Sequence, residues 1–520
     1  MPTLRHETHY GDRVVRCFAQ RPATIDATFR DAVARAPQRA ALVLGDERVS
    51  YRTLDEKIQA IAANLAQRGF RKGDRIALLL GNCFEFIDAM LACARAGIIV
   101  VPMSIRQRAP ETEFILNQCE AAGLIYHGDL AAHLPAREAT PSLRARFVVG
   151  DGPDTPFAVL TAPAPFADIA IGEEDVFALL YTSGTTGRPK GAMLTHIGTV
   201  HSLMHFQDGM ALRDGDVSVL AVPGSHVTGL VAIILTMIKV AGTTVLMPAF
   251  KARAFLELAA QTRMTHTLIV PAMYNLCLLD PDFARFDLSH WRVGGFGGAP
   301  MPEATIEKLA AMLPNLALIN AYGATETTSP VTLLPPGAVT THGDTVGKVL
   351  PCADIVVMGD DGREVAPGES GELWIAGPMV IPGYWNNPEA DRTAFCGGYW
   401  KSGDIGSIDA RGYVRVFDRK KDMINRGGYK IYCIEVEGVL ARHPQVIECA
   451  VIGRPDPVLG ERVHAVIVPR SAEVDVAELK AFCAQSLSDY KVPETIALIP
   501  DALPRNANGK VLKTVLRERA

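Results

Sequence analysis

Strand-like and helix-like segments alternate through roughly the first 400 residues, and this alternation restricts the fold more than any other feature of the chain. Apolar runs such as 76–80 (Ile-Ala-Leu-Leu-Leu) and 98–101 (Ile-Ile-Val-Val) are separated by stretches with helical periodicity such as 55–65. A strand, a helix and a second strand form a crossover unit, which brings parallel strands together. The alternation resumes at 219–222, 243–247, 267–270 and 316–319. We therefore predict an α/β fold with parallel-rich sheets and helices.

The chain is too long for one hydrophobic core, and its pattern of predicted helices and strands changes twice along the sequence. It has 520 residues, whereas a single core supports roughly 250–300. From about residue 353, short strands with turn signals, such as 367–371 (Pro-Gly-Glu-Ser-Gly), replace the alternation. A charged run at 418–422 fits either a solvated turn or a hinge before a separate α+β domain. We predict an N-terminal domain over 1–419, with a β subdomain over 353–419, and a small mobile C-terminal domain over 420–520.

Composition excludes several classes of function. The net charge is −5 and no long basic run occurs, so nothing attracts nucleic acid in general. The ten cysteines form no C-x-x-C pair, which favours reduced thiols in a cytoplasmic protein over a zinc site. Residues 1–20 carry charges throughout and predict neither a signal peptide nor a membrane anchor. The apolar segment 230–240 is too short for a transmembrane helix, so we predict a buried helix there.

A loop rich in glycine and threonine follows the apolar run 176–180. Residues 181–191 read Tyr-Thr-Ser-Gly-Thr-Thr-Gly-Arg-Pro-Lys-Gly. After a strand, such a loop presents backbone N–H groups and hydroxyls to an anion, and a nucleotide phosphate is the obvious candidate. It is not a Walker A loop, because no G-x-x-x-x-G-K-[ST] spacing fits. An ordinary flexible loop is the alternative.

Two later blocks supply other groups that a nucleotide needs. The glycines of 294–300 (Gly-Gly-Phe-Gly-Gly-Ala-Pro) would let the backbone approach a ligand, although a tight turn fits as well. Residues 320–327 (Asn-Ala-Tyr-Gly-Ala-Thr-Glu-Thr) place an aromatic ring, a hydroxyl and a carboxylate on one short loop after a strand. These groups can stack on a purine, contact a phosphate and bind Mg²⁺ through oxygen.

Two blocks nearer the C-terminus offer one carboxylate and one cation. Asp404 ends the segment 399–404 (Tyr-Trp-Lys-Ser-Gly-Asp) and could hold two ribose hydroxyls, although a surface Asp after Gly is commonplace. Lys510 ends the segment 503–510 (Leu-Pro-Arg-Asn-Ala-Asn-Gly-Lys), where proline and glycine shape a loop. A mobile cation there could stabilise a phosphoryl transition state, whereas an ordinary terminal lysine would be solvated.

In this order and spacing, the five blocks resemble the signature of the adenylate-forming superfamily, which includes acyl- and aryl-CoA ligases, luciferases and the adenylation domains of peptide synthetases. The resemblance extends from about residue 24 to residue 513. It implies ATP and Mg²⁺ in a first half-reaction, coenzyme A in a second, and a C-terminal domain that rotates between them. It leaves a homodimer open.

The resemblance also implies a role for each matching residue. The loop for the β,γ-phosphates of ATP would consist of Thr182, Ser183, Gly184, Thr185, Thr186, Gly187 and Lys190. The adenine slot and α-phosphate contacts would come from Gly298, Ala299, Pro300, Tyr322 and Thr325, the Mg²⁺ ligand from Glu326, and the ribose contacts from Asp404 and Arg419. Lys510 would serve adenylation, Lys421 the hinge, and the loop Gly427, Gly428, Tyr429 and Lys430 thioester formation.

The chain departs from the family pattern at two places. Where relatives usually have Pro-Leu-Phe-His, residues 223–226 read Pro-Gly-Ser-His, and this small pair would enlarge the mouth of the acyl pocket. His226 would still gate that pocket, although a buried core histidine with satisfied hydrogen bonds is the alternative. Cys433 replaces the usual proline of the loop before Glu435.

Four functions share this pattern of motifs. An acyl-CoA ligase is favoured over an adenylating enzyme that loads a carrier protein, because no acidic residue lies beside Ser225 and His226 to bind an amino group. A luciferase-like oxygenase is a rare outcome, and a binding protein without activity would be expected to have lost Glu326 or Lys510. The candidate pocket residues include no cation, which favours a hydrophobic monocarboxylic acid (fatty, alicyclic or aryl); they are Val227, Thr228, Phe296, Gly297, Pro330 and Val331.

Overall fold

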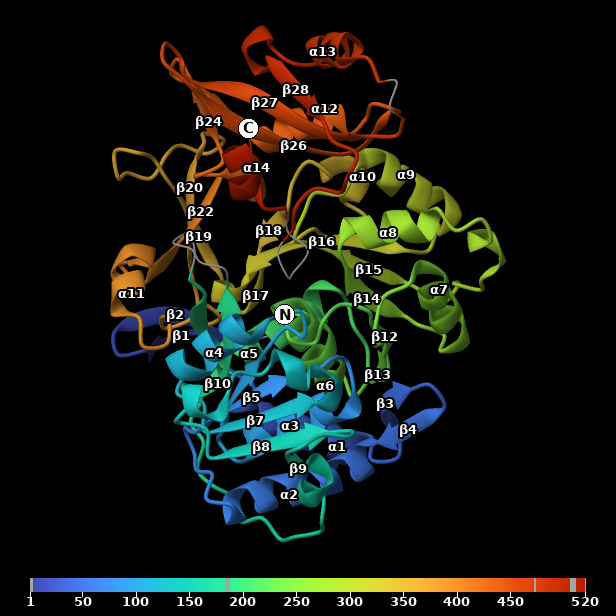
Figure 1. Cartoon of the computed structure of the whole chain (residues 1–520), viewed down its shortest axis with the longest axis vertical. Coiled ribbons are helices and arrows are strands. Elements are labelled where there is room, and N and C mark those ends of the chain that lie inside the picture. Colours follow the sequence, from blue (N-terminus) through green and yellow to red (C-terminus); the bar gives the residue numbers. More distant parts are fainter. Residues whose placement is uncertain (1–2, 183–187, 472–473, 506–510, 520) are drawn as a thin grey trace. The chain divides into compact units, whose positions relative to one another are not determined.

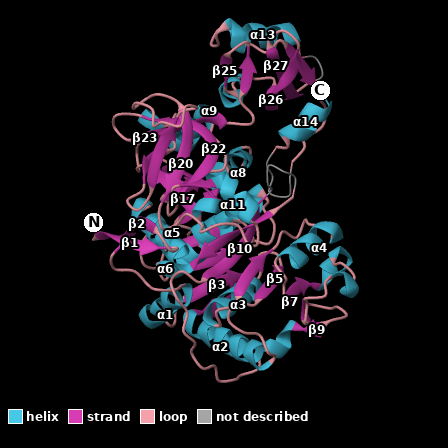
Figure 2. Cartoon of the chain, turned by 90° about the vertical axis from the view of Figure 1, so that its left-hand side faces the viewer, coloured by secondary structure: helices cyan, strands magenta, loops and turns pink. Residues whose placement is uncertain are grey.

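The computed structural model describes residues 3–182, 188–471, 474–505 and 511–519, in which helices and strands are mixed throughout (Figures 1 and 2). The chain divides into two compact units. The first contains Met1–Ile355 and Ile375–Trp400, and the second contains Val356–Trp374 and Lys401–Ala520. The predicted α/β fold class is confirmed. The predicted domain boundary between residues 419 and 420 lies inside the second unit and remains a prediction.

A seven-stranded sheet in the first unit has the predicted phosphate loop at one edge. Its strand order is β11-β10-β6-β5-β7-β8-β9, and all neighbours run parallel except β10 and β11. This arrangement confirms the crossover units predicted from the alternation. The strands are β5 (Arg75–Leu79), β6 (Ile99–Pro102), β7 (Gly123–His127), β8 (Ala145–Val149), β9 (Thr155–Pro156), β10 (Val176–Thr182) and β11 (Lys190–Thr195).

Nine further strands of the first unit form a second sheet in the order β18-β17-β16-β15-β14-β12-β13-β3-β4. From β16 to β3 in this order, neighbouring strands run parallel. β4 is antiparallel to β3, β17 is antiparallel to β16, and β18 is antiparallel to β17. The strands are β3 (Ala40–Leu44), β4 (Glu47–Ser50), β12 (Val217–Leu220), β13 (Thr243–Leu246), β14 (His266–Ile269), β15 (Val293–Phe296), β16 (Ala317–Ala324), β17 (Ser329–Leu333) and β18 (Gly347–Val349).

Amphipathic helices with polar caps connect these strands. Ser50 accepts a hydrogen bond from the Thr53 N–H at the start of α2, a contact that stabilises a helix by about 1 kcal/mol. Thr24 caps α1 in the same way. The main helices of the unit are α1 (Ile25–Arg35), α2 (Tyr51–Gln67), α3 (Phe84–Arg95), α4 (Ala109–Gln118), α5 (His196–Gly209), α7 (Ala252–Gln261), α8 (Pro271–Leu278), α9 (Glu303–Met312), α10 (Val339–His342) and α11 (Pro388–Ala394).

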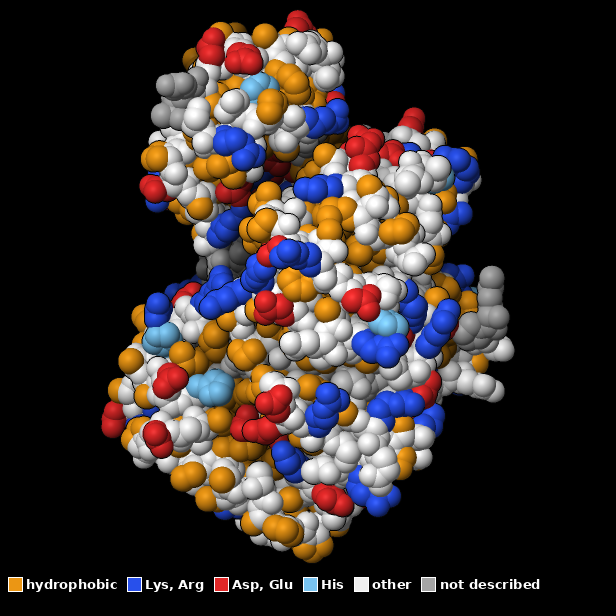
Figure 3. All heavy atoms as spheres, turned by 90° about the vertical axis from the view of Figure 1, so that its right-hand side faces the viewer, with side chains coloured by type: hydrophobic (Ala, Val, Ile, Leu, Met, Phe, Trp, Pro, Cys, Tyr) orange, Lys and Arg blue, Asp and Glu red, His pale blue; other side chains and the backbone are white. Residues whose placement is uncertain are grey.

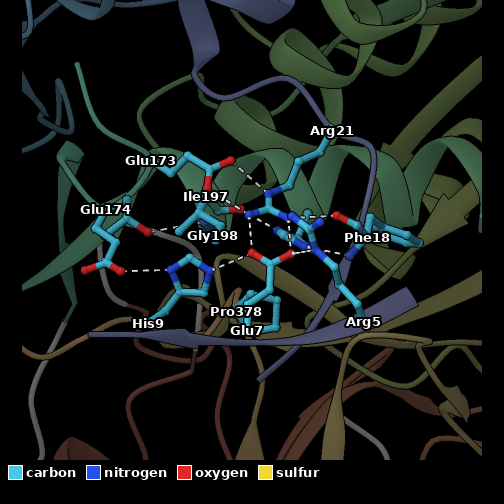
Figure 4. A network of polar contacts seen from close by, with 12 residues as sticks. Arg5, Glu7, His9, Phe18, Arg21, Glu173, Glu174, Ile197, Gly198 and Pro378 are labelled. Carbon is cyan, nitrogen blue, oxygen red and sulfur yellow. Dashed lines mark hydrogen bonds and ion pairs between the residues drawn. The ribbon is translucent and has the colours of Figure 1, made fainter. Parts of the chain in front are cut away.

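The N-terminal segment forms a β-hairpin that the sequence analysis did not predict. β1 (Leu4–His9) pairs antiparallel with β2 (Arg13–Phe18). Figure 4 shows Arg21 between Glu7 of the hairpin and Glu173, and its Nη2 lies 2.7 Å from a carboxylate oxygen of each. The Arg21 side chain is almost fully buried, so this ion pair is shielded from solvent. The hairpin is thereby held against the segment that precedes β10.

The apolar segment 230–240 is a buried helix, as predicted. It begins with a π-helix, η4 (Thr228–Leu235), and continues as α6 (Thr236–Lys239). Every residue from Gly229 to Ile238 is buried. Among the described residues, no helix combines the length and the apolar character needed to cross a membrane.

The second unit contains two sheets. One has the order β19-β20-β22-β23, and the other has the order β25-β24-β27-β26 with β28 beside β27. Ile424, Val436 and Ile467 lie in the buried core of the second sheet and its helices. The elements are β19 (Asp354–Met358), β20 (Gly371–Ala376), β22 (Tyr399–Ile408), β23 (Tyr413–Arg419), β24 (Ile424–Arg426), β25 (Tyr429–Ile431), β26 (Val446–Asp456), β27 (Gly460–Pro469), β28 (Thr495–Leu498), α12 (Cys433–Leu440), α13 (Val476–Ala484) and α14 (Lys513–Arg519).

Both signs of charge occur across the molecular face shown in Figure 3, with Lys and Arg interspersed among Asp and Glu. This distribution fits the small net charge of −5. A protein that binds the phosphate backbone of nucleic acid usually has its basic side chains clustered on one face. The face in Figure 3 has no large patch of side chains of a single charge.

Candidate active site

The β10–β11 hairpin carries the predicted phosphate loop. β10 ends at Thr182, β11 begins at Lys190, and these two residues are paired in the antiparallel register. Cross-strand partners place their side chains on the same face, so the Thr182 hydroxyl and the Lys190 ammonium group flank the loop together. Five residues of the predicted loop lie outside the described residues: Ser183, Gly184, Thr185, Thr186 and Gly187.

The block 320–327 is not the short loop that we predicted. Its first five residues belong to β16, and Thr325–Thr327 form a 3-10 turn, η6. β16 is extended because it pairs with β15 up to Asn320 and then with β17 from Ala321 to Ala324. A Cβ atom on Gly323 would lie 1.9 Å from the Ser329 carbonyl oxygen, so only glycine permits this close pairing.

The structure brings Glu326 to the mouth of the β10–β11 hairpin. Its Oε1 accepts hydrogen bonds from the Thr182 hydroxyl at 3.4 Å and the Tyr384 hydroxyl at 2.9 Å. No donor in the described part of the chain contacts Oε2, and the side chain is partly exposed. A carboxylate oxygen beside a phosphate loop is the kind of ligand that Mg²⁺ prefers. Glu326 therefore fits the predicted metal role.

The turn after Glu326 is held in an unusual backbone conformation. Thr328 and Ser329 have φ values of 51° and 86°, in the left-handed region that favours glycine. Each such residue costs about 1–3 kcal/mol and persists only where the surroundings enforce it. Here the Thr327 hydroxyl lies 2.7 Å from the Ser329 carbonyl oxygen, and the Thr328 hydroxyl donates to the Met379 carbonyl oxygen at 2.7 Å. These bonds fix the backbone that carries Glu326.

The predicted adenine residues lie at the ends of two neighbouring strands. β15 ends at Phe296 and pairs in parallel with β16, in which Phe296 is opposite Asn320. The carboxyl ends of neighbouring parallel strands meet at one sheet edge, where α/β proteins commonly bind ligands. Gly298 has a φ of 77°, which glycine adopts without strain. Gly298, Ala299 and Pro300 are exposed at this edge, and Tyr322 and Thr325 are partly exposed.

His226 follows β12 and begins the turn into η4. Its Nδ1 accepts the Thr228 backbone N–H at 3.3 Å, so in the neutral ring Nε2 carries the proton. Burial lowers the pKa of His226, which favours that neutral form. One ring nitrogen is thus satisfied, as in a core histidine, and no hydrogen bond to the other is found among the described residues. Val227, Phe296 and Val331, three of the predicted pocket residues, are buried.

Asn82 positions the segment before His226, a role that was not predicted from the sequence. Its Nδ2 lies within hydrogen-bond distance of three strand-end carbonyls, those of Leu220, Val222 and Met247, and its Oδ1 accepts the Gly224 N–H at 2.8 Å. A Cβ atom on Gly224 would lie 3.1–3.4 Å from atoms of Phe86, Asn82 and Ile234, so a larger residue would crowd these neighbours. That the pair Gly224 and Ser225 enlarges the mouth of the acyl pocket stays a prediction. A lone Asn after a strand carries no signal that would have marked this role.

The predicted ribose residues pair within the second unit. Asp404 lies in β22 opposite Arg419 in β23, and Arg419 Nε is 2.8 Å from Asp404 Oδ1. Asp404 is buried, so it is not the commonplace surface Asp that was the alternative. The guanidinium group fixes one oxygen of the carboxylate.

The charged run at 418–422 is only partly solvated. Asp418 is buried and accepts the Cys433 backbone N–H, and burial raises its pKa. Asp422 is buried and lies 2.8 Å from Arg517. Lys421, the predicted hinge, is exposed between these two anchors. Cys433 is the first residue of α12 and is buried, so it does not lie in a loop as we predicted.

The predicted thioester loop is a hairpin turn between β24 and β25. Gly427 and Gly428 have φ values of 58° and 92°. Tyr429 stacks on Tyr490 with ring centroids 4.6 Å apart, and Lys430 lies 2.9 Å from Asp360. Lys510 lies outside the described residues.

Family models match most of the chain. The model described as "AMP-binding enzyme" matches residues 29–385, and the model described as "AMP-binding enzyme C-terminal domain" matches residues 435–510. The chain belongs to the AMP-binding enzyme family. The family resemblance inferred from the sequence is thereby confirmed.

The names of the relatives of this AMP-binding enzyme specify different acids as substrates. A long-chain-fatty-acid–CoA ligase of Mycobacterium tuberculosis (FadD13) is 36% identical, with 91% of this chain and 93% of the relative covered. A feruloyl-CoA synthase of Amycolatopsis is 35% identical, with 93% and 96% covered. A fatty acid–acyl-carrier-protein ligase of Streptomyces coeruleorubidus (ScoC) is 32% identical, with 93% and 94% covered. With these relatives and this family, the chain is an AMP-forming acid–thiol ligase.

Solved structures of AMP-binding enzymes share the fold. The anthranilate CoA ligase AuaEII in complex with anthranoyl-AMP has a TM-score of 0.89 at 25% identity, and 96% of this chain and 98% of that chain are covered. The o-succinylbenzoate CoA synthetase MenE of Bacillus subtilis, in complex with ATP and a magnesium ion, has a TM-score of 0.83 at 28% identity, with 94% and 98% covered.

Proposed function

We propose that this enzyme activates a hydrophobic monocarboxylic acid (fatty, alicyclic or aryl) and transfers its acyl group to coenzyme A. In the first step, a carboxylate oxygen of the acid attacks the α-phosphorus of ATP, and the bond to the departing pyrophosphate breaks. In the second step, the CoA thiolate attacks the acyl carbon, and AMP leaves. The observation that carries this proposal is the contact between Thr182 and Glu326, which joins the phosphate-loop hairpin to a carboxylate whose other oxygen is contacted by no donor among the described residues.

The proposal gives each group of residues a task in the two steps. Thr182 and Lys190, with residues 183–187, would bind the β,γ-phosphates, and Glu326 would bind Mg²⁺. Bound Mg²⁺ neutralises charge on the phosphates, which makes pyrophosphate a better leaving group. Asp404 and Arg419 would hold the ribose, and Gly298, Ala299, Pro300, Tyr322 and Thr325 the adenine and α-phosphate.

The C-terminal residues would divide the two half-reactions. A carboxylate is a poor electrophile, so one site must first stabilise phosphoryl charge and then admit a thiol. We assign Lys510 to the first task and the Gly427–Lys430 turn to the second, with Lys421 as the hinge. The exposed position of Lys421 between buried Asp418 and Asp422 supports the hinge, because its backbone can turn while its neighbours stay anchored.

The acid class rests on the apolar pocket candidates. Val227, Phe296 and Val331 are buried and uncharged, and Asn82 fixes the segment that leads to His226. A dicarboxylate would need a cation there, and the six candidate residues include none. Fatty acid and ferulate, which are named for two relatives, both fall in this class. A role in fatty acid or lipid metabolism would follow. All ten cysteines are free, which agrees with a cytoplasmic location.

A carrier protein is the second candidate acceptor, because the relative ScoC is named as an acyl-carrier-protein ligase. The two acceptors can be separated directly. A panel of fatty, alicyclic and aryl acids would be assayed for AMP release with ATP and either CoA or a phosphopantetheinylated carrier protein. We expect CoA-dependent AMP release with at least one hydrophobic monoacid and none with malonate. AMP release that required the carrier protein would identify the carrier protein, and not CoA, as the acceptor. A preference for malonate would overturn the proposed class of acid.

A further inference from the structure

Residues 383–385 (Gly-Tyr-Trp) run along the outer side of β11. No role was predicted for them from the sequence. The Trp385 N–H donates to the Gly191 carbonyl oxygen at 2.8 Å, and Ala192 forms an antiparallel bridge with Tyr384. The Met193 N–H donates to the Gly383 carbonyl oxygen at 3.3 Å. This segment therefore extends the sheet beside the strand that begins at Lys190.

The Tyr384 side chain contacts two predicted site residues at once. Its hydroxyl donates to Glu326 Oε1 at 2.9 Å, and its ring lies beneath Lys190, with Nζ 5.2 Å from the ring centroid. A cation over an aromatic face at this distance is attracted by the ring. A tyrosine hydroxyl carries its proton at neutral pH, so Tyr384 is the donor in this hydrogen bond.

The backbone of Tyr384 is itself held from several sides. The Tyr384 N–H donates to Asp391 Oδ1 at 2.8 Å, and the Ile381 N–H donates to the Glu326 carbonyl oxygen at 2.9 Å. Arg13 of the N-terminal hairpin donates to the Ile381 and Pro382 carbonyl oxygens, at 2.9 Å each. The N-terminal hairpin thus anchors the segment that places Tyr384 beneath the site.

We propose that Tyr384 is a positioning residue for adenylation. Its hydroxyl holds Oε1 of Glu326 and leaves Oε2 for the cation, while its ring holds Lys190 at the start of β11 for the phosphates. The inference rests on the proposed function, because it requires that Glu326 binds Mg²⁺. Partners that orient a metal ligand typically change metal affinity by about 10–100-fold when they are removed.

A tyrosine that only stabilised the fold would make the same hydrogen bond. The test must therefore measure the affinity for the metal ion. The variant is Tyr384→Phe, which removes the hydroxyl and keeps the ring under Lys190. The matched control is Tyr51→Phe, because Tyr51 is also buried and donates to a carbonyl oxygen, that of Gly242, at 2.7 Å. Mn²⁺ binding to the full-length enzyme with α,β-methylene-ATP would be followed by electron paramagnetic resonance, and melting temperatures would check folding.

We expect Tyr384→Phe to weaken Mn²⁺ binding by about 10-fold and Tyr51→Phe to leave it unchanged. In pyrophosphate release, Tyr384→Phe should raise the Mg²⁺ concentration for half-maximal rate by a similar factor, with the KM for the acid unchanged. Equal Mn²⁺ affinity in Tyr384→Phe and the unmodified enzyme would overturn the inference. So would equal weakening in both tyrosine variants.

Glu326→Gln separates this inference from the proposed function. If Glu326→Gln does not weaken Mn²⁺ binding, the metal assignment itself fails. If Glu326→Gln weakens binding and Tyr384→Phe does not, only the positioning role fails. The double variant should bind Mn²⁺ no more weakly than Glu326→Gln alone, because the hydroxyl acts through that carboxylate, and additive losses would contradict this.

Arg13→Gln provides a second variant should Tyr384→Phe fold poorly. It removes the hairpin's contacts with the Ile381 and Pro382 carbonyls and leaves Tyr384, Glu326 and Lys190 intact. Because it loosens the segment indirectly, we expect a weakening of Mn²⁺ binding of about 2–3-fold, below the direct effect. Unchanged Mn²⁺ affinity in a folded Arg13→Gln enzyme would contradict the anchoring of Tyr384 by the hairpin.

Discussion

The Thr182 hydroxyl lies 3.4 Å from Glu326 Oε1, so residues 144 positions apart in the chain meet at one point. Thr182 ends the strand before the phosphate loop, and Glu326 lies in the turn after β16. The contact places a hydroxyl and a carboxylate at the mouth of the same loop. In the proposed function both serve adenylation, because a hydroxyl can donate to a phosphate oxygen and a carboxylate can hold the Mg²⁺ that neutralises phosphate charge.

Glu326→Gln tests the metal role through catalysis. The amide keeps the size and the hydrogen bonds of the side chain but loses its charge, so the Mg²⁺ concentration for half-maximal pyrophosphate release should rise by about 10-fold or more. The KM for the acid should change little, because Glu326 does not contact the acid in the proposal. An unaltered Mg²⁺ titration would remove Glu326 from the metal site.

Lys510→Ala tests the division of labour between the half-reactions. We expect pyrophosphate release from acid and ATP to fall by about 100-fold or more, because a cation at the transition state is lost. CoA thioester formation from a supplied acyl-adenylate should remain close to normal, since the proposed function assigns Lys510 to the first step only. Equal losses of rate in both assays would show that Lys510 acts in both steps or is needed for folding.

Lys421→Pro tests the hinge. Proline fixes φ near roughly −65° and removes a donor, so the domain should be trapped in one arrangement. Because adenylation comes first, the variant should retain pyrophosphate release and lose most CoA consumption from supplied acyl-adenylate. A variant that runs the whole reaction at the normal rate would move the pivot to Asp418 or Lys420.

Three buried histidines of α5 should make the first unit sensitive to acid. The rings of His196, His201 and His205 accept the backbone N–H groups of Ile25, Phe18 and Cys352 at 3.1–3.3 Å. Burial lowers the pKa of His201 to about 4, whereas an unfolded histidine has a pKa of about 6.5. The unfolded chain therefore binds more protons between these values, and stability that is present above pH 6.5 is lost as the pH falls towards 4.

His201→Gln is the matching variant, because Gln keeps an acceptor and does not titrate. Between pH 7 and pH 4.5, its free energy of unfolding should fall by about 2–3 kcal/mol less than that of the unmodified enzyme. Urea unfolding at the two pH values, followed by tryptophan fluorescence, measures the difference. Identical losses in both proteins would mean that His201 is not buried in its neutral form.

The sequence by itself determined the crossover strands of the first unit, their parallel direction and the family to which the chain belongs. Runs such as 76–80 became buried parallel strands, because a strand covered on both faces must be apolar throughout. The types and order of the residues that we assign to phosphate, Mg²⁺ and ribose were also readable in the sequence, and these assignments remain predictions. Asp404 and Arg419, for example, were expected to act together and are paired.

Only the tertiary structure decided which distant residues support that site. Tyr384 reaches Glu326 across 58 positions, and Asn82 reaches Gly224 across 142. The left-handed φ of Thr328 and Ser329 likewise depends on contacts from outside the turn. Periodicity and turn preferences report interactions between near neighbours, whereas these contacts depend on how the sheets assemble. A tyrosine or an asparagine in the sequence therefore gives no sign of the partner that it will find.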